Sequence, residues 1–569
     1  MNPPTQRVEP RVLLHSYPYI TVIGVVANPS EEAVVREFFE LFKTPWEFCQ
    51  PGRSYSVVLC ADGSNPSRYE TNLVLVYGGK TLAADAALGI AALASGKGQL
   101  LEHGQFHIPI YGTNLAFEAA QGSAGTDRRG GPVWKSTVDR RTVIRIGYDL
   151  FAEVRTLLTQ GQPVANAAIP TLELHIALLR SLIVGNGVAL VEIPPVPEGY
   201  RLIACLTHDI DHPLLRRHMF DHTMFGFLYR ATLGSLMNAV RGKLGWSEAR
   251  RNWAAALKLP RVYLGLAKDP WAEFDRYTEL EAGAPSSFFV IPFAGRAGRK
   301  RDSAAPSARA AGYGAVDIKP QLESVISAGC EVGLHGIDAW MDAAAGREEM
   351  AEVRRVTGQQ EIGVRMHWLY FDEQSPAALE QAGASYDSTV GYNETIGFRA
   401  GTSQVYQPLE SSRLLELPLH VMDTALFYPA YLNLSAEEAK ARTGSLLDSV
   451  VHHGGCVTVN WHDRSIAAER LWGEAYTDLV KTLRAKGAWF ATASECVAWF
   501  RERRAVRFEV QLDGTVRASL QMPAAGTTLP PMMMRTHTDI FRPAKDGVLH
   551  ATAESKAAKA VDALEASRA

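Results

Sequence analysis

The segment that most plainly could do chemistry is LTHDIDHP, residues 206–213, where two carboxylates follow an apolar run. On a continuing strand, residues i and i+2 share a face, so Asp209 and Asp211 would point the same way. Two adjacent carboxylates repel each other unless a cation or a proton relieves them. A metal ligand beside a base fits this pattern, and so does a solvated turn with helix-capping aspartates.

Two further apolar runs end in histidine. EVGLHGID ends a strand-like run on His335, and VRMHWLYFD places Arg365 and His367 two positions apart. Carboxylate and imidazole form an N/O ligand set that suits Zn²⁺, with Co²⁺ or Ni²⁺ as alternatives. Three such ligands would leave one coordination position for water.

A fourth run, CVTVNWHDR, ends on Trp461 and His462, an aromatic side chain next to a titratable imidazole. Histidine is the usual general acid near neutral pH. Asp423 follows the run LELPLHVMD, where its carboxylate could orient that imidazole and raise its pKa. It could equally cap a helix.

In this order, the segments resemble the polysaccharide deacetylases, the carbohydrate esterase barrels with a NodB homology domain, over residues 201–500. Asp209 and Asp211 match the family's first motif, although Ile210 separates them. His335 matches the first histidine of the second motif, but Ala339 stands where the other histidine is expected. A divergent branch with THDxD, GLH, RxHxLxF, GFRAGT and a late strand-end histidine is similar throughout, at 207–211, 333–335, 365–371, 397–402 and His462.

The resemblance implies a zinc-dependent site. Asp209 would be the base, and the metal ligands would be Asp211, His335 and His367. Asp338 is the alternative to His367, with less weight because a second carboxylate would make the site more anionic.

The resemblance also implies roles around the metal. Arg365 would hold the base ionised, and His462, oriented by Asp423, would protonate the leaving amine. Trp461 would wall the pocket for the acyl methyl. Arg399 of the GFRAGT segment would bind a sugar hydroxyl or carboxylate, or form a structural salt bridge.

The expected activity is metal-dependent hydrolysis of an N-acyl amide, N-acetyl in the first instance, on an amino sugar or glycan. Two alternatives stay open. One is a hydrolase of small amides or N-formyl groups on the same barrel, and the other is an inactive barrel that binds glycan.

The length of 569 residues favours more than one domain. Recurring apolar runs with helical stretches between them predict a distorted (β/α)7-8 barrel over 199–503, with functional groups at the strand ends. An α/β domain of unknown role is expected over 1–198. VRFEVQL and VRASLQM, which flank Asp513-Gly514-Thr515, predict a small β appendage over 504–545, followed by a flexible or helical tail over 546–569.

Residues 213–268 interrupt the barrel with a predicted helical insertion that carries ten Lys or Arg against only Asp221 and Glu248. It is interpreted either as a helical cover over the barrel mouth or as a surface for anionic glycan or lipid headgroups, a peripheral membrane contact.

The remaining composition narrows the class of protein. A net charge of -3 and 47% hydrophobic residues describe a globular chain and give no sign of a nucleic-acid partner. The six scattered cysteines predict buried free thiols. No signal peptide or membrane-spanning run is evident, so a cytoplasmic protein is expected. The oligomeric state is not predicted.

Overall fold

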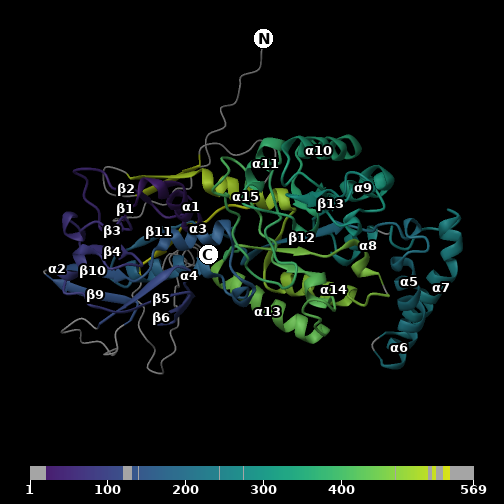
Figure 1. Cartoon of the computed structure of the whole chain (residues 1–569), viewed down its shortest axis with the longest axis horizontal. Helices are drawn as coiled ribbons and strands as arrows, with labels where there is room; N and C mark the ends of the chain where they lie inside the picture. The colour runs from purple at the N-terminus through teal and green to yellow at the C-terminus, as the bar shows by residue number, and fades with distance from the viewer. Residues whose placement is uncertain are drawn as a thin grey trace, which may run out of the picture.

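A computed structural model describes residues 21–118, 131–138, 140–242, 244–272, 274–467, 469–510, 516–520 and 529–538. Figure 1 shows an N-terminal α/β domain at one end, a sheet surrounded by helices in the middle, and helices α5 (His222–Tyr229), α6 (Ser235–Val240) and α7 (Trp246–Tyr263) at the other end. All six cysteines are free and five of them are buried. Among the described residues, no helix is both long and apolar enough to cross a bilayer.

The N-terminal domain is organised by a sheet whose described strands follow the order β2-β1-β3-β4-β10-β9, parallel except for the pair β9·β10. Its inner strands are runs of Val, Leu and Ile, which suit strands buried on both faces. The strands are β1 (Ile23–Val26), β2 (Trp46–Phe48), β3 (Val57–Cys60), β4 (Leu73–Tyr77), β9 (Val133–Val138) and β10 (Arg141–Ile146). The helices are α1 (Glu32–Phe42), α2 (Ala83–Ala87), α3 (Leu150–Thr159) and α4 (Thr171–Val184). Two ribbons pair β5 (Ala92–Lys97) with β8 (Thr113–Phe117) and β6 (Leu100–His103) with β7 (Phe106–Pro109).

The second sheet positions the predicted site. Its described strands follow the order β17-β16-β13-β12-β19-β18, with β20 also beside β12, and every pair is parallel. The strands are β12 (Leu202–Ile210), β13 (Ser286–Val290), β16 (Glu331–Gly336), β17 (Val364–Met366), β18 (Val421–Met422), β19 (Cys456–Asn460) and β20 (Ala488–Phe490). All nine residues of β12 are buried, so the sheet centre lies in the main core.

Helices connect these strands and cover the sheet. They are α8 (Asp275–Leu280), α9 (Lys319–Ser327), α10 (Ala343–Thr357), α11 (Ser375–Ala382), α12 (Asp423–Phe427), α13 (Ala436–His453), α14 (Gly473–Ala485) and α15 (Ala493–Ala505). α10 shows how the sequence sets such boundaries. Asp342 caps its first turn by accepting from two backbone amides, and Gly358, at a φ of 76°, ends it in the left-handed region.

The second sheet is a parallel half-barrel, and regular strands do not complete the predicted ring within the described part of the chain. Two of the recurring apolar runs, ASYDSTV (384–390) and LLELPLH (414–420), form only isolated bridges and single backbone hydrogen bonds, such as Leu417 N to Asp387 O at 2.8 Å. Pro418 interrupts the second run, because proline lacks the amide hydrogen that a strand ladder needs.

The C-terminal strands lie in two places. β21 (Val506–Val510) and β22 (Val516–Leu520) form the expected antiparallel pair, and the predicted turn at Asp513-Gly514-Thr515 lies outside the described residues. β23 (Arg535–His537) pairs with β11 (Leu190–Glu192), a strand from the N-terminal part of the chain. The predicted tail over 546–569 also lies outside the described residues.

Candidate active site and metal centre

The end of β12 brings the two predicted aspartates to the edge of the second sheet. Asp209 is the penultimate residue of the strand and is almost fully buried, whereas Asp211 follows its last residue. β16 and β17 end nearby on the same side of the parallel sheet, because neighbouring parallel strands share their direction. These ends carry His335 and, directly after β17, His367.

Three donor groups converge there. One ligand atom from each of Asp211, His335 and His367 lies within 4.8 Å of the others. Asp211 Oδ1 is 3.3 Å from His335 Nε2 and 3.2 Å from His367 Nδ1, and the two nitrogens are 3.0 Å apart. Donors held at about 2.0 Å by a tetrahedral ion lie about 3.3 Å from one another, so the spacing fits Zn²⁺.

Backbone carbonyls set the tautomers of both histidines. His335 Nδ1 is 3.0 Å from Arg365 O, and His367 Nε2 is 3.0 Å from Arg309 O. A carbonyl only accepts, so each of these outer nitrogens carries the proton. Burial also lowers the pKa of His367, which favours its neutral form. In neutral rings the inner nitrogens then present lone pairs to each other.

Asp211 adds negative charge to those lone pairs. Its Oδ1 is buried and accepts no hydrogen bond within the described part of the chain. Three electron-pair donors that face one another without a proton between them fit a divalent cation.

Asp209 lies beside this trio but is held differently. Its Oδ1 accepts from Arg365 Nη1 at 3.0 Å, and its Oδ2 accepts from Asn460 Nδ2 at 2.7 Å. Asp209 Oδ2 is 3.9 Å from His335 Nε2. The carboxylate therefore has fixed orientation and a permanent positive partner, and it faces the same space as the metal donors.

Arg365 is itself immobilised. Its guanidinium donates to Thr207 Oγ1 at 2.6 Å and to Ser388 O and Oγ at 2.9 and 2.8 Å, and it lies over the Phe289 ring. The side chain is fully buried. A buried, fully bonded arginine therefore holds its positive charge against the Asp209 carboxylate.

His462 and Asp423 form a pair on the far side of Asp211. His462 Nδ1 is 2.6 Å from Asp423 Oδ1, and its backbone amide donates to Asp423 Oδ2 at 2.8 Å. Burial alone would lower the pKa of His462, but Asp423 outweighs it and raises the pKa to about 10. The other ring nitrogen, Nε2, lies 3.9 Å from Asp211 Oδ2. A protonated imidazole thus faces the metal donors.

The chain turns sharply just after His367. Trp368 and Leu369 both have positive φ, at 62° and 51°, and neither is glycine. Arg309 braces this turn by donating to His367 O at 2.9 Å. Consecutive left-handed residues at a cluster of donors are a strained backbone of the kind found at functional sites.

Asp338, the alternative ligand, is not part of the donor cluster. Its Oδ1 accepts from Arg299 N at 2.7 Å, and its own amide donates to Glu349. Ala339 is fully buried in the main core against α10. The structure therefore brings His367 to the position next to Asp211 and His335.

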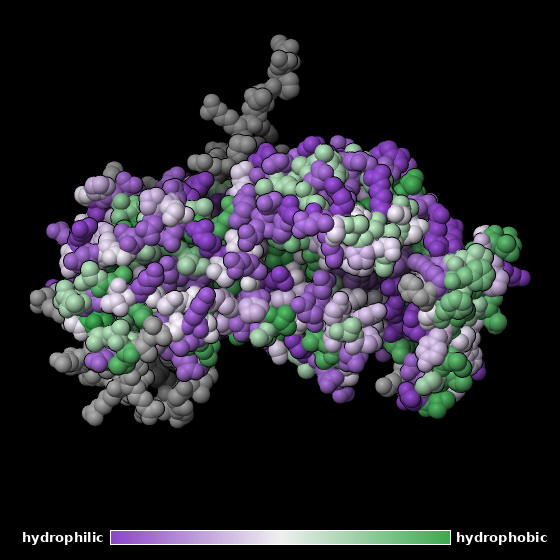
Figure 2. All heavy atoms as spheres, viewed as in Figure 1, coloured by the Kyte–Doolittle hydropathy of each residue, from purple (hydrophilic) through white to green (hydrophobic). Residues whose placement is uncertain are grey.

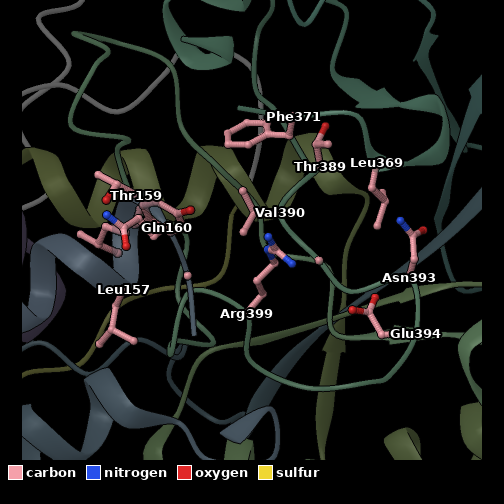
Figure 3. A pocket seen from close by; sticks show the side chains of 14 residues that line it. Leu157, Thr159, Gln160, Leu369, Phe371, Thr389, Val390, Asn393, Glu394 and Arg399 are labelled. Carbon is pink, nitrogen blue, oxygen red and sulfur yellow. The ribbon is translucent and has the colours of Figure 1, made fainter. Parts of the chain in front are cut away.

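Arg399 and its segment lie elsewhere. Arg399 lines a cavity of about 180 Å³ together with residues of α3 and of the loop after His367, and its side chain points toward Val390 (Figure 3). The guanidinium lies over the Tyr392 ring, and no carboxylate lies within the 4.0 Å of an ion pair among the described residues. The structural salt bridge that was one of the two predicted roles of Arg399 is therefore absent among the described residues.

The rest of the GFRAGT segment forms hydrogen bonds with the N-terminal domain. Gln162 donates its backbone amide to Arg399 O and its side-chain amide to Phe398 O. Glu173 of α4 accepts from Thr402 Oγ1 at 2.6 Å and from Ser403 N at 2.9 Å. Burial raises the pKa of Glu173 to about 7. The segment is thus an interface between two parts of the chain.

Trp461 is only 1% exposed. Its ring packs against Tyr476 and Phe427 in the main core, and its indole nitrogen has no hydrogen-bond partner among the described residues. Its contact with an acyl group stays a prediction.

Two residues were missed from the sequence. Asn460 orients Asp209 by donating to its carboxylate and accepting from its backbone amide. Arg309 O fixes the tautomer of His367. Asn460 stands within the run CVTVNWHDR, two residues before His462, so its place at a strand end was a usable signal. The carbonyl of Arg309 lies 58 residues from His367 in the chain, and no sequence signal indicated their contact.

Comparisons with known proteins find fold neighbours only. No family model and no curated protein matches the chain. A structure from Mycobacterium smegmatis described as a polysaccharide deacetylase is 18% identical, covering 55% of this chain and 95% of that one, with a TM-score of 0.32. One from Pseudomonas aeruginosa PAO1 is 14% identical over 55% and 94%, with a TM-score of 0.34. Agd3, a carbohydrate deacetylase, is 9% identical over 91% and 98%, with a TM-score of 0.32. Likenesses this distant establish nothing about the activity of this chain.

Proposed function

We propose that this protein is a metal-dependent hydrolase that removes an N-acyl group, in the first instance acetyl, from an amino sugar or glycan. One observation carries the proposal: the lone pairs of His335 and His367 face the Asp211 carboxylate. On either side of these three groups lie the hydrogen-bonded carboxylate of Asp209 and the protonated imidazole of His462. The sugar as substrate rests on the resemblance of the sequence motifs to the deacetylase barrels.

Asp211, His335 and His367 would hold the metal, Zn²⁺ or alternatively Co²⁺ or Ni²⁺. Bound there, such an ion would make water more acidic and polarise the amide carbonyl. The second contacts of both histidines, to Arg365 O and Arg309 O, would keep their lone pairs directed at it.

The residues of the chain divide the proton transfers between them. Asp209, paired with Arg365 and oriented by Asn460, accepts a proton from the attacking water. His462 gives the proton on Nε2 to the amine as the C–N bond breaks, and Asp423 stabilises the imidazolium before that step. Water adds to the acyl carbon, so the products are a carboxylic acid and a free amine.

The two substrate contacts belong to the proposal as well. Trp461 would line the pocket for the acyl group. Arg399 would bind a hydroxyl or carboxylate in the cavity of Figure 3. This cavity includes Leu369, which follows the proposed metal donor His367 by two residues.

The experiment combines metal analysis with product release. Purified protein is assayed for bound divalent metal and for acetate or formate release from a panel of N-acyl amino sugars and small amides. The expected result is about one equivalent of metal, with acid release that a chelator stops and Zn²⁺ restores. Metal binding with no release from any sugar, but with release from small amides, would replace the sugar by a small amide. A chain that binds glycan but no metal would be an inactive barrel.

A further inference from the structure

The arm formed by residues 219–266 carries an unusual amount of exposed apolar surface. Helices α5 and α6 join through a π-helical segment (Arg230–Gly234) and pack along α7. Figure 2 shows hydrophobic residues gathered over this end of the molecule. Twelve large apolar side chains of the arm are between 41% and 82% exposed: Met219, Phe220, Phe225, Tyr229, Leu233, Leu236, Met237, Val240, Trp246, Leu257, Leu264 and Leu266.

Four of these side chains form an apolar stripe on the α5–α6 helix. Phe225, Tyr229, Leu233 and Val240 are spaced by four, four and seven residues, which places them on one face of the α5–α6 helix. The opposite face is buried against α7, where Asn252 Nδ2 donates to Ser235 Oγ at 2.9 Å. The α5–α6 helix is therefore packed on one side, and the apolar stripe on its other side stays exposed.

The arm is also strongly basic in an acidic chain. Ten Lys and Arg against two acids give residues 213–268 a formal charge of +8, whereas the whole chain carries -3. Both acids are already paired, Asp221 with His218 and Glu248 with Arg251. Six exposed cations have no carboxylate partner among the described residues: Arg216, Arg241, Arg250, Lys258, Arg261 and Lys268.

We propose that this arm docks the protein on an anionic lipid bilayer, with the apolar stripe inserted at the headgroup level and the cations on phosphates. Apolar and basic residues alternate along its surface, as in the neighbours Val240 and Arg241 or Leu257 and Lys258. This combination binds anionic membranes through buried apolar area and electrostatic attraction together. A second copy of the arm would instead bring two cationic surfaces together.

Docking would have a consequence for the site. The arm follows β12, the strand that carries Asp209, and only the short segment with the turn Leu215–Arg217 separates them. The strand that carries Asp209 would then be tethered to the membrane through the arm.

The test is vesicle co-sedimentation of the full chain, using phosphatidylcholine vesicles with and without phosphatidylglycerol. The wild type is expected to pellet with the anionic vesicles and to be released by high salt. The triple variant Phe225→Ser/Leu233→Ser/Val240→Ser is expected to bind at least about tenfold more weakly. The matched control Leu93→Ser/Leu100→Ser/Val164→Ser removes similarly exposed side chains from the N-terminal domain and is expected to bind as the wild type does.

A second variant protects the test against misfolding. Arg241→Glu/Lys258→Glu leaves the apolar stripe intact and is expected to lose anionic-vesicle binding while it keeps its metal affinity. Wild-type protein that ignores anionic vesicles would overturn the proposal. So would a dimer that the triple variant converts to a monomer without any vesicle binding by the wild type, because the stripe would then be covered by a second copy.

Discussion

Two polar clusters of this protein differ in how their donors and acceptors meet. At the end of β12, Asp211, His335 and His367 present acceptors to one another. At the GFRAGT segment, Glu173 accepts hydrogen bonds from Thr402 and Ser403, which are donors. Both clusters join segments far apart in the chain, and the family resemblance placed His335, His367 and the GFRAGT segment among its motifs.

The difference lies in how donors and acceptors balance. In the interface cluster, one carboxyl oxygen of Glu173 accepts from hydroxyl and amide donors and stabilises the contact between domains, while its Oε2 has no partner among the described residues. In the site cluster, the histidine protons point outward to carbonyls and three acceptors meet with no donor. Three acceptors that face one another without a donor fit a cation between them, whereas a single carboxyl that faces several donors fits a structural contact.

The largest effect on activity is expected from Asp209→Asn. The amide keeps the shape of the carboxylate but cannot accept a proton, so turnover should fall by about 10⁴ while metal content stays normal. Activity and metal analysis on the same preparation measure both. Asp338→Asn, close by but outside the donor cluster, is the control and should keep both. Loss of metal in Asp209→Asn, with retention in Asp211→Asn, would reverse the two roles.

A smaller loss is expected from His462→Ala. Removal of the imidazole that faces Asp211 should lower kcat by about 10² to 10⁴, the usual contribution of a proton donor, and change KM little. The rate should recover on substrates whose leaving group needs no protonation. An undiminished rate on an ordinary N-acyl amine would exclude His462 as the acid.

Asp423→Asn should act through pH. Because Asp423 raises the pKa of His462 to about 10, the protonated acid is present below that pH and is lost as the pH rises through it. Without the carboxylate, the pKa falls, and the alkaline limb of kcat/KM should move to lower pH by about 1 to 3 pH units. A pH–rate profile of both proteins measures the difference. An unmoved alkaline limb would separate Asp423 from the chemistry.

The smallest effect on the site is expected from Glu173→Ala in the interface cluster. The change leaves buried donors of Thr402 and Ser403 unpaired, so the protein should lose about 1 to 3 kcal/mol of stability. Metal affinity should stay normal, and Glu173→Gln, which keeps an acceptor oxygen, should lose less. Denaturant unfolding and metal titration measure the two quantities. Weakened metal binding in a folded Glu173→Ala protein would contradict the separation of the two clusters.

Much of the site could be predicted because strand ends in a parallel sheet converge. Asp211, His335 and His367 each end an apolar run, and the pairing of Asp423 with His462 follows from neighbouring strands β18 and β19. Residue spacing could not predict which groups surround Arg399 and Glu173, because these contacts form between domains. The sequence also could not show that the segments between β17 and β18 are irregular, because their apolar composition resembles that of buried strands.

The central claim is that a metal lies between Asp211, His335 and His367. Equilibrium Zn²⁺ titration of the wild type, His335→Ala, His367→Ala and Asp338→Ala tests it most directly. The account predicts that both histidine variants lose affinity to a similar extent, at least about 100-fold, while Asp338→Ala binds as the wild type does. Normal affinity in His367→Ala, together with loss in Asp338→Ala, would contradict it.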